Sequence, residues 1–253
     1  MLEPLFHVKI CGVTTPADAR LAAAAGADAV GLNFVAGSPR RLDPDAAREV
    51  ARAVPAGVLK VGVFAGSTAD AIRRLAEAVG LDAVQLHGHL GVAGEAGPVD
   101  PPELCAAVGG LPVIRAVRLE PHDPGGDAFA AARLWIARAA AAGAGPALAL
   151  VDAAVAAGTD AGRLGGTGAR ADWAAVAAAA PLPVPVALAG GLTPANVAAA
   201  ITASGCRAVD TASGVESAAG VKDPALVAAF VAAARRGLAS LPDSRSLRIG
   251  RDG

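Results

Sequence analysis

Short runs of β-branched and other apolar residues alternate along the chain with longer, alanine-rich segments whose apolar positions recur at helical spacing. Glycine, proline or aspartate marks the joints. The short runs predict eight strands, near residues 7–11, 28–34, 58–64, 82–87, 112–118, 147–152, 184–189 and 206–210. The longer segments predict eight helices, near residues 16–25, 44–54, 68–79, 101–108, 127–142, 170–180, 194–203 and 223–237. Strands that alternate with helices in this way predict an α/β protein with a parallel sheet.

A weak internal repeat favours a closed barrel over a doubly wound open sheet. The segments 26–30, 80–84 and 205–209 each begin with a glycine suited to a helix C-cap, followed by a short link and a strand. The spacing of the first two fits two units of about thirty residues, the average in a (β/α)8 barrel. No GxGxxG motif follows the first strand, which argues against an open sheet that binds a dinucleotide. We therefore expect a single (β/α)8 TIM barrel over residues 1–237, followed by a flexible C-terminal tail at 238–253.

Length and charge narrow the possible partners. The chain has 253 residues, and a TIM barrel typically takes roughly 250. The formal net charge is −1, with acidic and basic residues interspersed, so we expect neither a nucleic acid nor a membrane as partner. The most apolar run, residues 174–189, is interrupted by three prolines, and the N-terminus does not resemble a signal peptide. We expect a cytoplasmic protein that is a monomer or a homodimer.

The cysteines and aromatic residues exclude several classes of site. The three cysteines have neither CxxC spacing nor an even count, which predicts reduced thiols and no bound metal. Tyrosine is absent and aromatic residues make up 3% of the chain, which disfavours base-stacking platforms and haem pockets.

In a barrel of this kind, the chemistry lies at the C-terminal ends of the strands. The first predicted strand ends at Cys11, the fourth carries Gln85 and His87 on one face, and the sixth ends at Asp152. A thiol and a carboxylate at strand ends are candidates for acid–base work. The residues alone leave alternatives open: Cys11 as a small buried hydrophobe, and Asp152 as a helix cap or loop anchor.

Glycines after three successive strands predict a phosphate site. Gly190 and Gly191 follow the seventh strand, Ser213 and Gly214 follow the eighth, and a glycine-rich loop at 165–168 follows the sixth. Backbone amides without Cβ crowding can converge on an anion, and barrels often bind phosphate between the last two loops. The alternative is that these glycines simply form tight turns, in a chain that has 31 of them.

Taken together, these segments resemble the phosphoribosylanthranilate isomerase family, and they occur in the same order from residue 9 to about 223. The matching motifs are Lys9-Ile10-Cys11-Gly12, Ser38-Pro39-Arg40, Val84-Gln85-Leu86-His87-Gly88, Gly165-Gly166-Thr167-Gly168 with Asp172-Trp173, Leu188-Ala189-Gly190-Gly191-Leu192, Ser213-Gly214-Val215-Glu216 and Gly220-Val221-Lys222-Asp223. Each motif alone is weak, whereas the ordered set is specific.

The resemblance implies an enzyme of tryptophan biosynthesis that needs no cofactor. It converts N-(5-phosphoribosyl)anthranilate, a small phosphorylated sugar derivative, to 1-(2-carboxyphenylamino)-1-deoxyribulose 5-phosphate by an Amadori rearrangement. The family's general base matches Cys11, its general acid matches Asp152, and the arginine expected at the anthranilate end matches Arg40. The positions expected to bind substrate besides Arg40 are Gln85, His87, Gly166, Thr167, Gly190, Gly191, Ser213 and Gly214.

Four expectations can be tested by a structure. The thiol pKa must be lowered and the Asp152 pKa raised for catalysis near neutrality, and Lys9 either assists the thiol or pairs with a carboxylate deeper in the barrel. The segments 88–100 and 119–127 are expected to be surface loops. The competing functions are the histidine-pathway Amadori isomerase, which has an aspartate in place of Cys11, and a non-catalytic sugar-phosphate-binding barrel.

Overall fold

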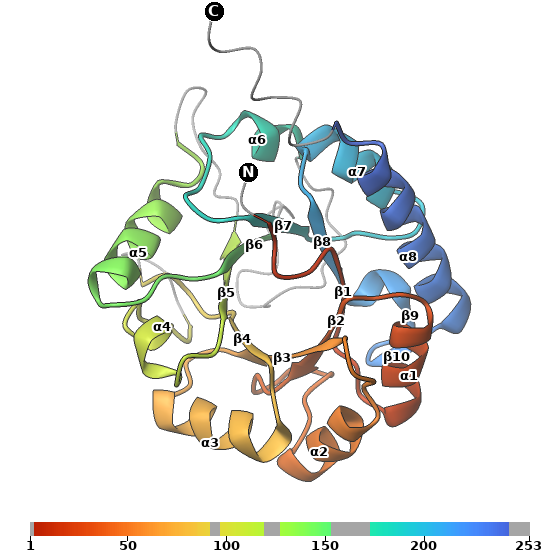
Figure 1. Ribbon diagram of the computed structural model, residues 1–253, viewed down its shortest axis with the longest axis horizontal. Helices are drawn as coiled ribbons and strands as arrows, with labels where there is room; N and C mark the ends of the chain where they lie inside the picture. Colours follow the sequence, from red (N-terminus) through yellow and green to blue (C-terminus); the bar gives the residue numbers. More distant parts are fainter. Residues whose placement is uncertain (1–2, 92–96, 119–126, 153–172, 243–253) are drawn as a thin grey trace, which may run out of the picture.

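The computed structural model describes residues 3–91, 97–118, 127–152 and 173–242, which form a closed barrel of parallel strands with helices on the outside (Figure 1). The strands, paired in sequence order with β8 returning to β1, are β1 (Val8–Cys11), β2 (Ala29–Asn33), β3 (Leu59–Phe64), β4 (Ala83–Leu86), β5 (Val113–Arg118), β6 (Leu148–Asp152), β7 (Val186–Ala189) and β8 (Ala208–Thr211). The helices are α1 (Pro16–Ala24), α2 (Pro44–Arg52), α3 (Ala69–Val79), α4 (Leu104–Ala107), α5 (Ala130–Ala141), α6 (Trp173–Ala178), α7 (Val197–Ser204) and α8 (Pro224–Ala239). The predicted TIM barrel is confirmed.

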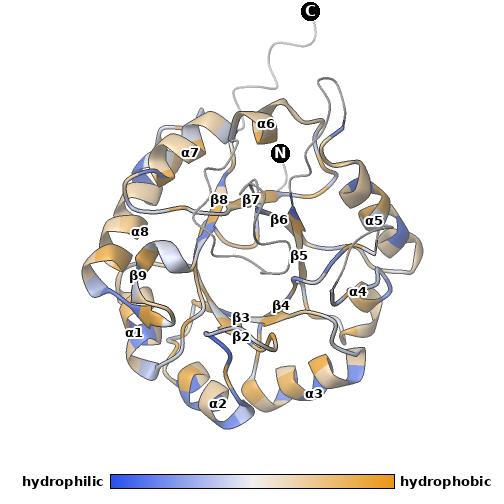
Figure 2. Ribbon diagram, turned by 180° about the vertical axis from the view of Figure 1, so that it is seen from behind, coloured by the Kyte–Doolittle hydropathy of each residue, from blue (hydrophilic) through white to orange (hydrophobic). Residues whose placement is uncertain are grey.

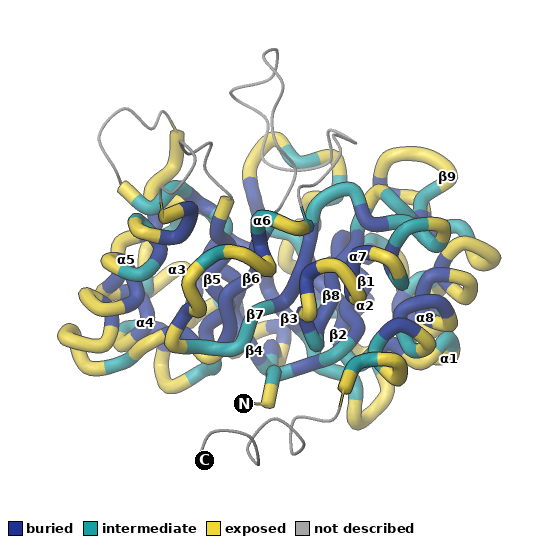
Figure 3. The backbone as a smooth tube through the Cα atoms, turned by 90° about the horizontal axis from the view of Figure 1, so that it is seen from above, coloured by how far each residue is buried: buried dark blue, intermediate teal, exposed yellow. Residues whose placement is uncertain are grey.

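Two apolar layers hold the barrel together. Side chains that alternate along each strand fill either the barrel interior or the space between strands and helices, and the apolar faces of the helices turn inward (Figure 2). In β1, Val8 and Ile10 pack in the outer layer, so the period of two places Lys9 and Cys11 on the inner face. The strands are buried, and exposed residues lie on the outer rim (Figure 3).

Local signals explain where several helices begin. Thr15, Asp43 and Asp223 each accept hydrogen bonds from backbone N–H groups of the first helical turn, and a proline follows each of them. Asn196 delays the start of α7 beyond the predicted residue 194. Its side chain accepts from the Thr193 amide and donates to the Gly191 carbonyl, which forms a turn there instead.

Helix α8 extends two residues beyond its predicted end at 237 and reaches Ala239. Leu238 and Leu241 pack against the outer layer, so the start of the predicted tail belongs to the folded domain. Residues 243–253, on which the rest of that prediction falls, lie outside the described residues. Among the residues described, no helix has both the length and the apolar character needed to cross a membrane.

The loop after β8 contains elements that the hydrophobic pattern did not predict. A single 3-10 turn, η1 (Ser213–Val215), leads into a two-stranded antiparallel hairpin of β9 (Glu216–Ala218) and β10 (Val221–Lys222). Gly220 adopts a φ of 81° at its tight end, a conformation that glycine accommodates without strain. The hairpin is too short to show a clear alternation of polar and apolar residues.

The expectation of a surface loop over 88–100 is wrong at its C-terminal end, because Asp100 is completely buried. Its carboxylate accepts from the amides of Gly66 and Gly88 and lies 3.2 Å from Arg115, which is equally buried. The guanidinium of Arg115 also stacks over the ring of Trp135, at 4.8 Å from its centroid. A buried carboxylate is tolerated here because its oxygens are hydrogen-bonded and its charge is paired.

Candidate active site

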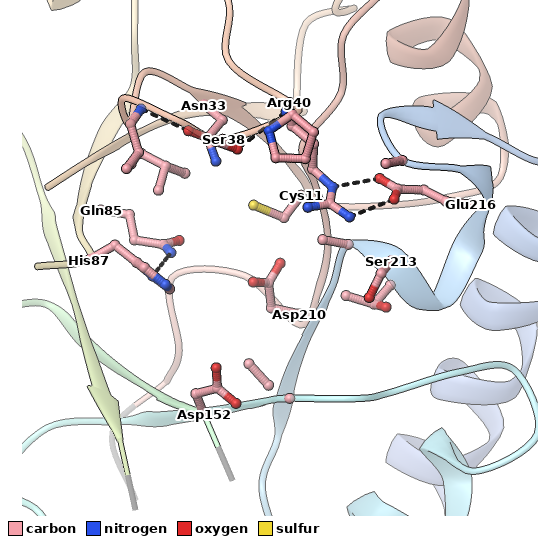
Figure 4. Close-up of a pocket in the computed structure, with 18 of the residues that line it drawn as sticks. Cys11, Asn33, Ser38, Arg40, Gln85, His87, Asp152, Asp210, Ser213 and Glu216 are labelled. Carbon is pink, nitrogen blue, oxygen red and sulfur yellow. Dashed lines mark hydrogen bonds and ion pairs between the residues drawn. The ribbon is translucent and has the colours of Figure 1, made fainter. Parts of the chain in front are cut away.

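A cavity of about 590 Å³ opens at the C-terminal ends of the strands, and the side chains of several strands point into it (Figure 4). Its walls include most of the predicted site residues, which come from strands and loops far apart in the sequence. The predicted residues that line it are Cys11, Arg40, Gln85, His87, Asp152, Gly190, Gly191 and Ser213.

One predicted binding residue that the structure describes, Gly214, is not in this lining. A Cβ atom at Gly214 would be 1.8 Å from the Leu192 carbonyl oxygen. Glycine is thus what lets the loop after β8 approach the loop after β7 so closely. Gly166 and Thr167 lie outside the described residues.

The thiol of Cys11 ends β1 at the cavity wall and is 8% exposed. It fits beside β2 because residue 31 is glycine; a Cβ at Gly31 would lie 2.6 Å from the Cys11 sulfur. Burial raises the pKa of the thiol above its ordinary value, and Asp210 adds to this, while Lys9 and Lys222 act in the opposite direction. The expected lowering of the thiol pKa is therefore not found in the free protein.

Lys9 pairs with a carboxylate, which was one of its two expected roles. Its Nζ lies 2.9 Å from Oδ1 of Asp210, and the lysine is fully buried. Burial lowers the pKa of Lys9, but the charges of Asp210 and Cys11 more than offset this and leave it raised. Lys9 therefore stays charged between the thiol and the carboxylate.

Asp210 lines the cavity and is the clearest site residue that the sequence did not single out. It is 7% exposed, and burial raises its pKa against the opposing effect of Lys9, with the charge of Asp152 adding to the increase. A signal was present, since Asp210 sits near the end of the eighth predicted strand and a lysine two residues before Cys11 needs a buried partner.

Gln85 and His87 form a neutral polar pair on the wall nearest β4. Gln85 Nε2 lies 3.2 Å from His87 Nδ1, and burial, followed by the charges of Arg118, Lys9 and Arg115, lowers the pKa of His87 to about 4. The ring is therefore neutral near pH 7; with the amide donating to Nδ1, its proton is on Nε2. Gln85 Oε1 is buried without a hydrogen-bond partner in the described part of the chain.

Arg40 reaches the cavity from the loop after β2 and is held by a carboxylate that the sequence analysis did not assign. Its Nε and one terminal nitrogen donate to the two oxygens of Glu216, at 2.7 and 2.6 Å. The side chain crosses residue 12, where a Cβ would lie 2.2 Å from Arg40 Cδ, so Gly12 makes room for it. The hydrogen bonds to Glu216 raise the pKa of Arg40, which remains a cation at the cavity mouth.

Two of the glycines predicted to bind phosphate, Gly190 and Gly191, line the cavity. Gly190 and Gly191 adopt φ angles of 90° and 61°, and Thr211 Oγ1 donates to the Leu192 carbonyl at 2.7 Å. This links the loop after β7 to the end of β8. In the part of the chain that the structure describes, no group of three or more His, Cys, Asp or Glu side chains is arranged to hold a metal ion.

Comparisons with known proteins identify the family of this chain. The family model described as N-(5'-phosphoribosyl)anthranilate (PRA) isomerase matches residues 8–99 and 133–233. An N-(5'-phosphoribosyl)anthranilate isomerase from Myxococcus xanthus is 44% identical over 230 residues, which cover 90% of this chain and 96% of the relative.

Solved structures of the same enzyme share the fold. Phosphoribosyl anthranilate isomerase from Thermotoga maritima has a TM-score of 0.72 and 30% identity, and covers 92% of this chain and 100% of its own. A phosphoribosyl anthranilate isomerase in complex with reduced 1-(o-carboxyphenylamino)-1-deoxyribulose 5-phosphate has a TM-score of 0.69 and 29% identity at the same coverage. The chain therefore belongs to the N-(5'-phosphoribosyl)anthranilate isomerase family and is an isomerase of tryptophan biosynthesis.

Proposed function

We propose that this chain converts N-(5'-phosphoribosyl)anthranilate to 1-(2-carboxyphenylamino)-1-deoxyribulose 5-phosphate, with Cys11 as the general base and Asp152 as the general acid. The observation that carries the assignment is that one cavity is lined by both side chains, from β1 and β6. Two strands separate β1 from β6 on one side of the barrel and four on the other. A sugar ring bound between them meets a proton donor on one side and an acceptor on the other.

The reaction needs a proton donor for the ring oxygen and a base that removes the C2′ proton. Asp152 donates a proton to the furanose ring oxygen, the C1′–O bond breaks, and the anilino nitrogen's electron pair forms an iminium. Cys11, as the thiolate, removes the C2′ proton, and the electrons of that C–H bond neutralise the iminium to give an enolamine. The enolamine then tautomerises to the ketone.

The raised pKa of Cys11 in the free protein fits this sequence of steps. A thiol in a buried site gives up its proton more readily when a cation is added nearby. The iminium formed by ring opening is such a cation, and Lys9 and Lys222 already act in the same direction. The base is thus strengthened at the stage at which it is needed.

The cavity offers a separate group for each anionic end of the substrate. Its lining includes the Arg40 guanidinium and the backbone of Gly190, Gly191 and Ser213. Guanidinium groups suit carboxylates and glycine amides suit phosphate, so the anthranilate carboxylate is assigned to Arg40 and the phosphate to the loops after β7 and β8. Neutral Gln85 and His87 also line the cavity and are assigned to substrate hydroxyls or the anilino group.

A fluorescence assay of phosphoribosylanthranilate consumption, with Cys11→Ala and Asp152→Asn, tests the proposal. Each variant should lose about two to four orders of magnitude in kcat while inorganic phosphate still competes with substrate. Consumption of the histidine-pathway Amadori substrate instead would replace the substrate assignment. Full activity in Cys11→Ala would show that Cys11 is not the base, without changing the substrate assignment.

We infer further that the enzyme works in the cytoplasm without metal or cofactor, as a monomer or a homodimer. All three cysteines are free and buried, which suits a reducing compartment. Light scattering during gel filtration decides between the two assemblies, and activity in the presence of a chelator tests the absence of a metal requirement.

A further inference from the structure

Three charged side chains, Arg40, Glu216 and Lys222, form a continuous chain beside the cavity, and Glu216 has no part in the mechanism above. Glu216 lies between Arg40 and Lys222, accepting from Arg40 through both oxygens and from Lys222 Nζ at 2.7 Å. The side chain of Lys222 is 0% exposed and that of Glu216 is 4% exposed. Burying charge at this depth is costly unless every partner is in place.

Lys222 connects the two strand ends that frame the site. Besides Glu216, its ammonium donates to the Cys11 carbonyl at 2.6 Å and to the Ala212 carbonyl at 3.0 Å, so all three N–H groups are used. One acceptor belongs to the thiol residue itself, and the other directly precedes Ser213 of the predicted phosphate loop. A shift of this ammonium would therefore move the backbone of the thiol residue and that of the phosphate loop together.

Glu216 fixes the direction of Arg40. An arginine side chain has five N–H donors, and the bidentate bond to Glu216 uses two of them, which leaves three for a ligand. The close fit across Gly12 and the bond to Glu216 give the long side chain one orientation, beside Cys11 in Figure 4. Two cations against one anion leave the cluster with a net positive charge, which suits an incoming carboxylate.

The energetics of the cluster agree with this arrangement. Burial works to raise the pKa of Glu216, but hydrogen bonds from Arg40 and Lys222 lower it, so the carboxylate stays ionised. Burial lowers the pKa of Lys222 against the opposing effect of Glu216. The positive charge of Lys222 in turn favours the thiolate form of Cys11.

We infer that Glu216 and Lys222 are positioning residues of this active site: Lys222 holds the backbone of Cys11 and keeps a positive charge beside its thiol, and Glu216 aims Arg40 at the substrate carboxylate. The inference rests on the roles proposed above for Cys11 and Arg40. The β9–β10 hairpin is thus a brace that joins the base to the carboxylate-binding arginine.

The test of Lys222 is the pH dependence of Cys11 alkylation by iodoacetamide, followed at that residue by mass spectrometry. Lys222→Met should move the midpoint upward by about one pH unit, because a cation near the thiolate is lost. Lys222→Arg keeps the charge but not the three-way hydrogen bonding, so the midpoint should stay within about half a unit while kcat falls. Lys60→Met is the matched control. Lys60, on β3, pairs with Asp82 and does not line the cavity, so its loss should change neither quantity.

The test of Glu216 is a comparison of KM with kcat. Glu216→Gln should raise the KM for phosphoribosylanthranilate about tenfold with kcat less affected, because aiming Arg40 contributes to substrate binding. Inhibition by inorganic phosphate should not change, since phosphate does not need Arg40. Glu216→Asp, which keeps the charge and shortens the reach, should raise KM less than Glu216→Gln.

The outcomes distinguish failure of the positioning roles of Lys222 and Glu216 from failure of the role proposed for Cys11. If Lys222→Met alkylates with the profile of wild type, the role of Lys222 is overturned; an unchanged KM in Glu216→Gln overturns that of Glu216. Should Lys222→Met fail to fold by circular dichroism, a wild-type kcat in folded Lys222→Arg would equally overturn the bracing role. Full activity in Cys11→Ala would instead refute Cys11 as the base, while the alkylation midpoint of the other variants still reports on Lys222.

Discussion

Lys9 Nζ lies 2.9 Å from Asp210 Oδ1, both residues are buried, and Asp210 lines the cavity that Cys11 and Asp152 also line. The bond joins β1 to β8, the two strands whose pairing closes the barrel. The same pair thus serves two purposes: it neutralises charge inside the barrel, and it holds a cation beside the thiol proposed as the base.

Asp210→Asn is expected to destabilise the protein by about 3–5 kcal/mol, because it leaves the ammonium of Lys9 buried without a counter-charge. The double variant Lys9→Met with Asp210→Asn should recover part of this loss, since it removes both charges. Urea unfolding of the single and double variants measures the difference. Equal stability of Asp210→Asn and wild type would show that the pair does not stabilise the barrel.

His87 should make stability depend on pH below neutrality. Its pKa is lowered to about 4 in the folded chain, against about 6.5 for an unperturbed histidine. Between these values the unfolded chain binds the proton and the folded chain does not, so stability present above pH 6.5 should fall as the pH drops toward 4, by up to about 1.4 kcal/mol per unit. Urea unfolding at pH 7.5 and 5 should show a smaller pH-dependent loss in His87→Gln than in wild type; identical losses would contradict the assignment.

Gly31→Ala is expected to lower kcat at least about tenfold without unfolding the protein. The new Cβ would lie 2.6 Å from the Cys11 sulfur, and displacing a reacting group by a fraction of an ångström is costly for turnover. Gly145→Ala is the matched control, because a Cβ there meets nothing within 4 Å. Steady-state kinetics and thermal melting of both variants make the comparison. Wild-type kcat in folded Gly31→Ala would mean that the position of the thiol is not critical.

Asp100→Ala is expected to cost about 3–5 kcal/mol of stability, because it removes the buried carboxylate that pairs with Arg115 and accepts from two backbone amides. Asp70, which pairs with Arg73 on the exposed face of α3, provides the comparison. Asp70→Ala should cost less than about 1 kcal/mol, since exposed ion pairs contribute little. Chemical denaturation should therefore show a clearly larger loss in the free energy of unfolding for Asp100→Ala than for Asp70→Ala. Similar losses in the two variants would argue against a structural role for Asp100.

Residues whose role depends on local pattern could be assigned from the sequence. The alternation of apolar and polar positions predicted the strands and helices, and the strand ends at Cys11 and Asp152 followed from it. The caps at Thr15, Asp43 and Asp223 follow from side chains that bond within their own first turn. Such signals are readable because the interacting atoms are only a few residues apart.

Residues whose role depends on distant partners could not be assigned. The sequence predicted that Asp100 is part of a surface loop. In the fold it is buried against Arg115 and two backbone amides, which come from other parts of the chain. Glu216 belonged to a matching motif, but nothing in the motif said that it would hold Arg40, 176 residues earlier in the chain.

The sequence by itself determined the barrel and placed Cys11 and Asp152 at the C-terminal ends of its strands, because the period of two along each strand and the order of the βα units are local properties. The tertiary structure alone decided the charges there: that Lys9 pairs with Asp210, that Arg40 is held by Glu216, and that burial raises the pKa of Cys11. A pKa depends on burial and on the charges within a few ångströms, and only closure of the barrel sets both.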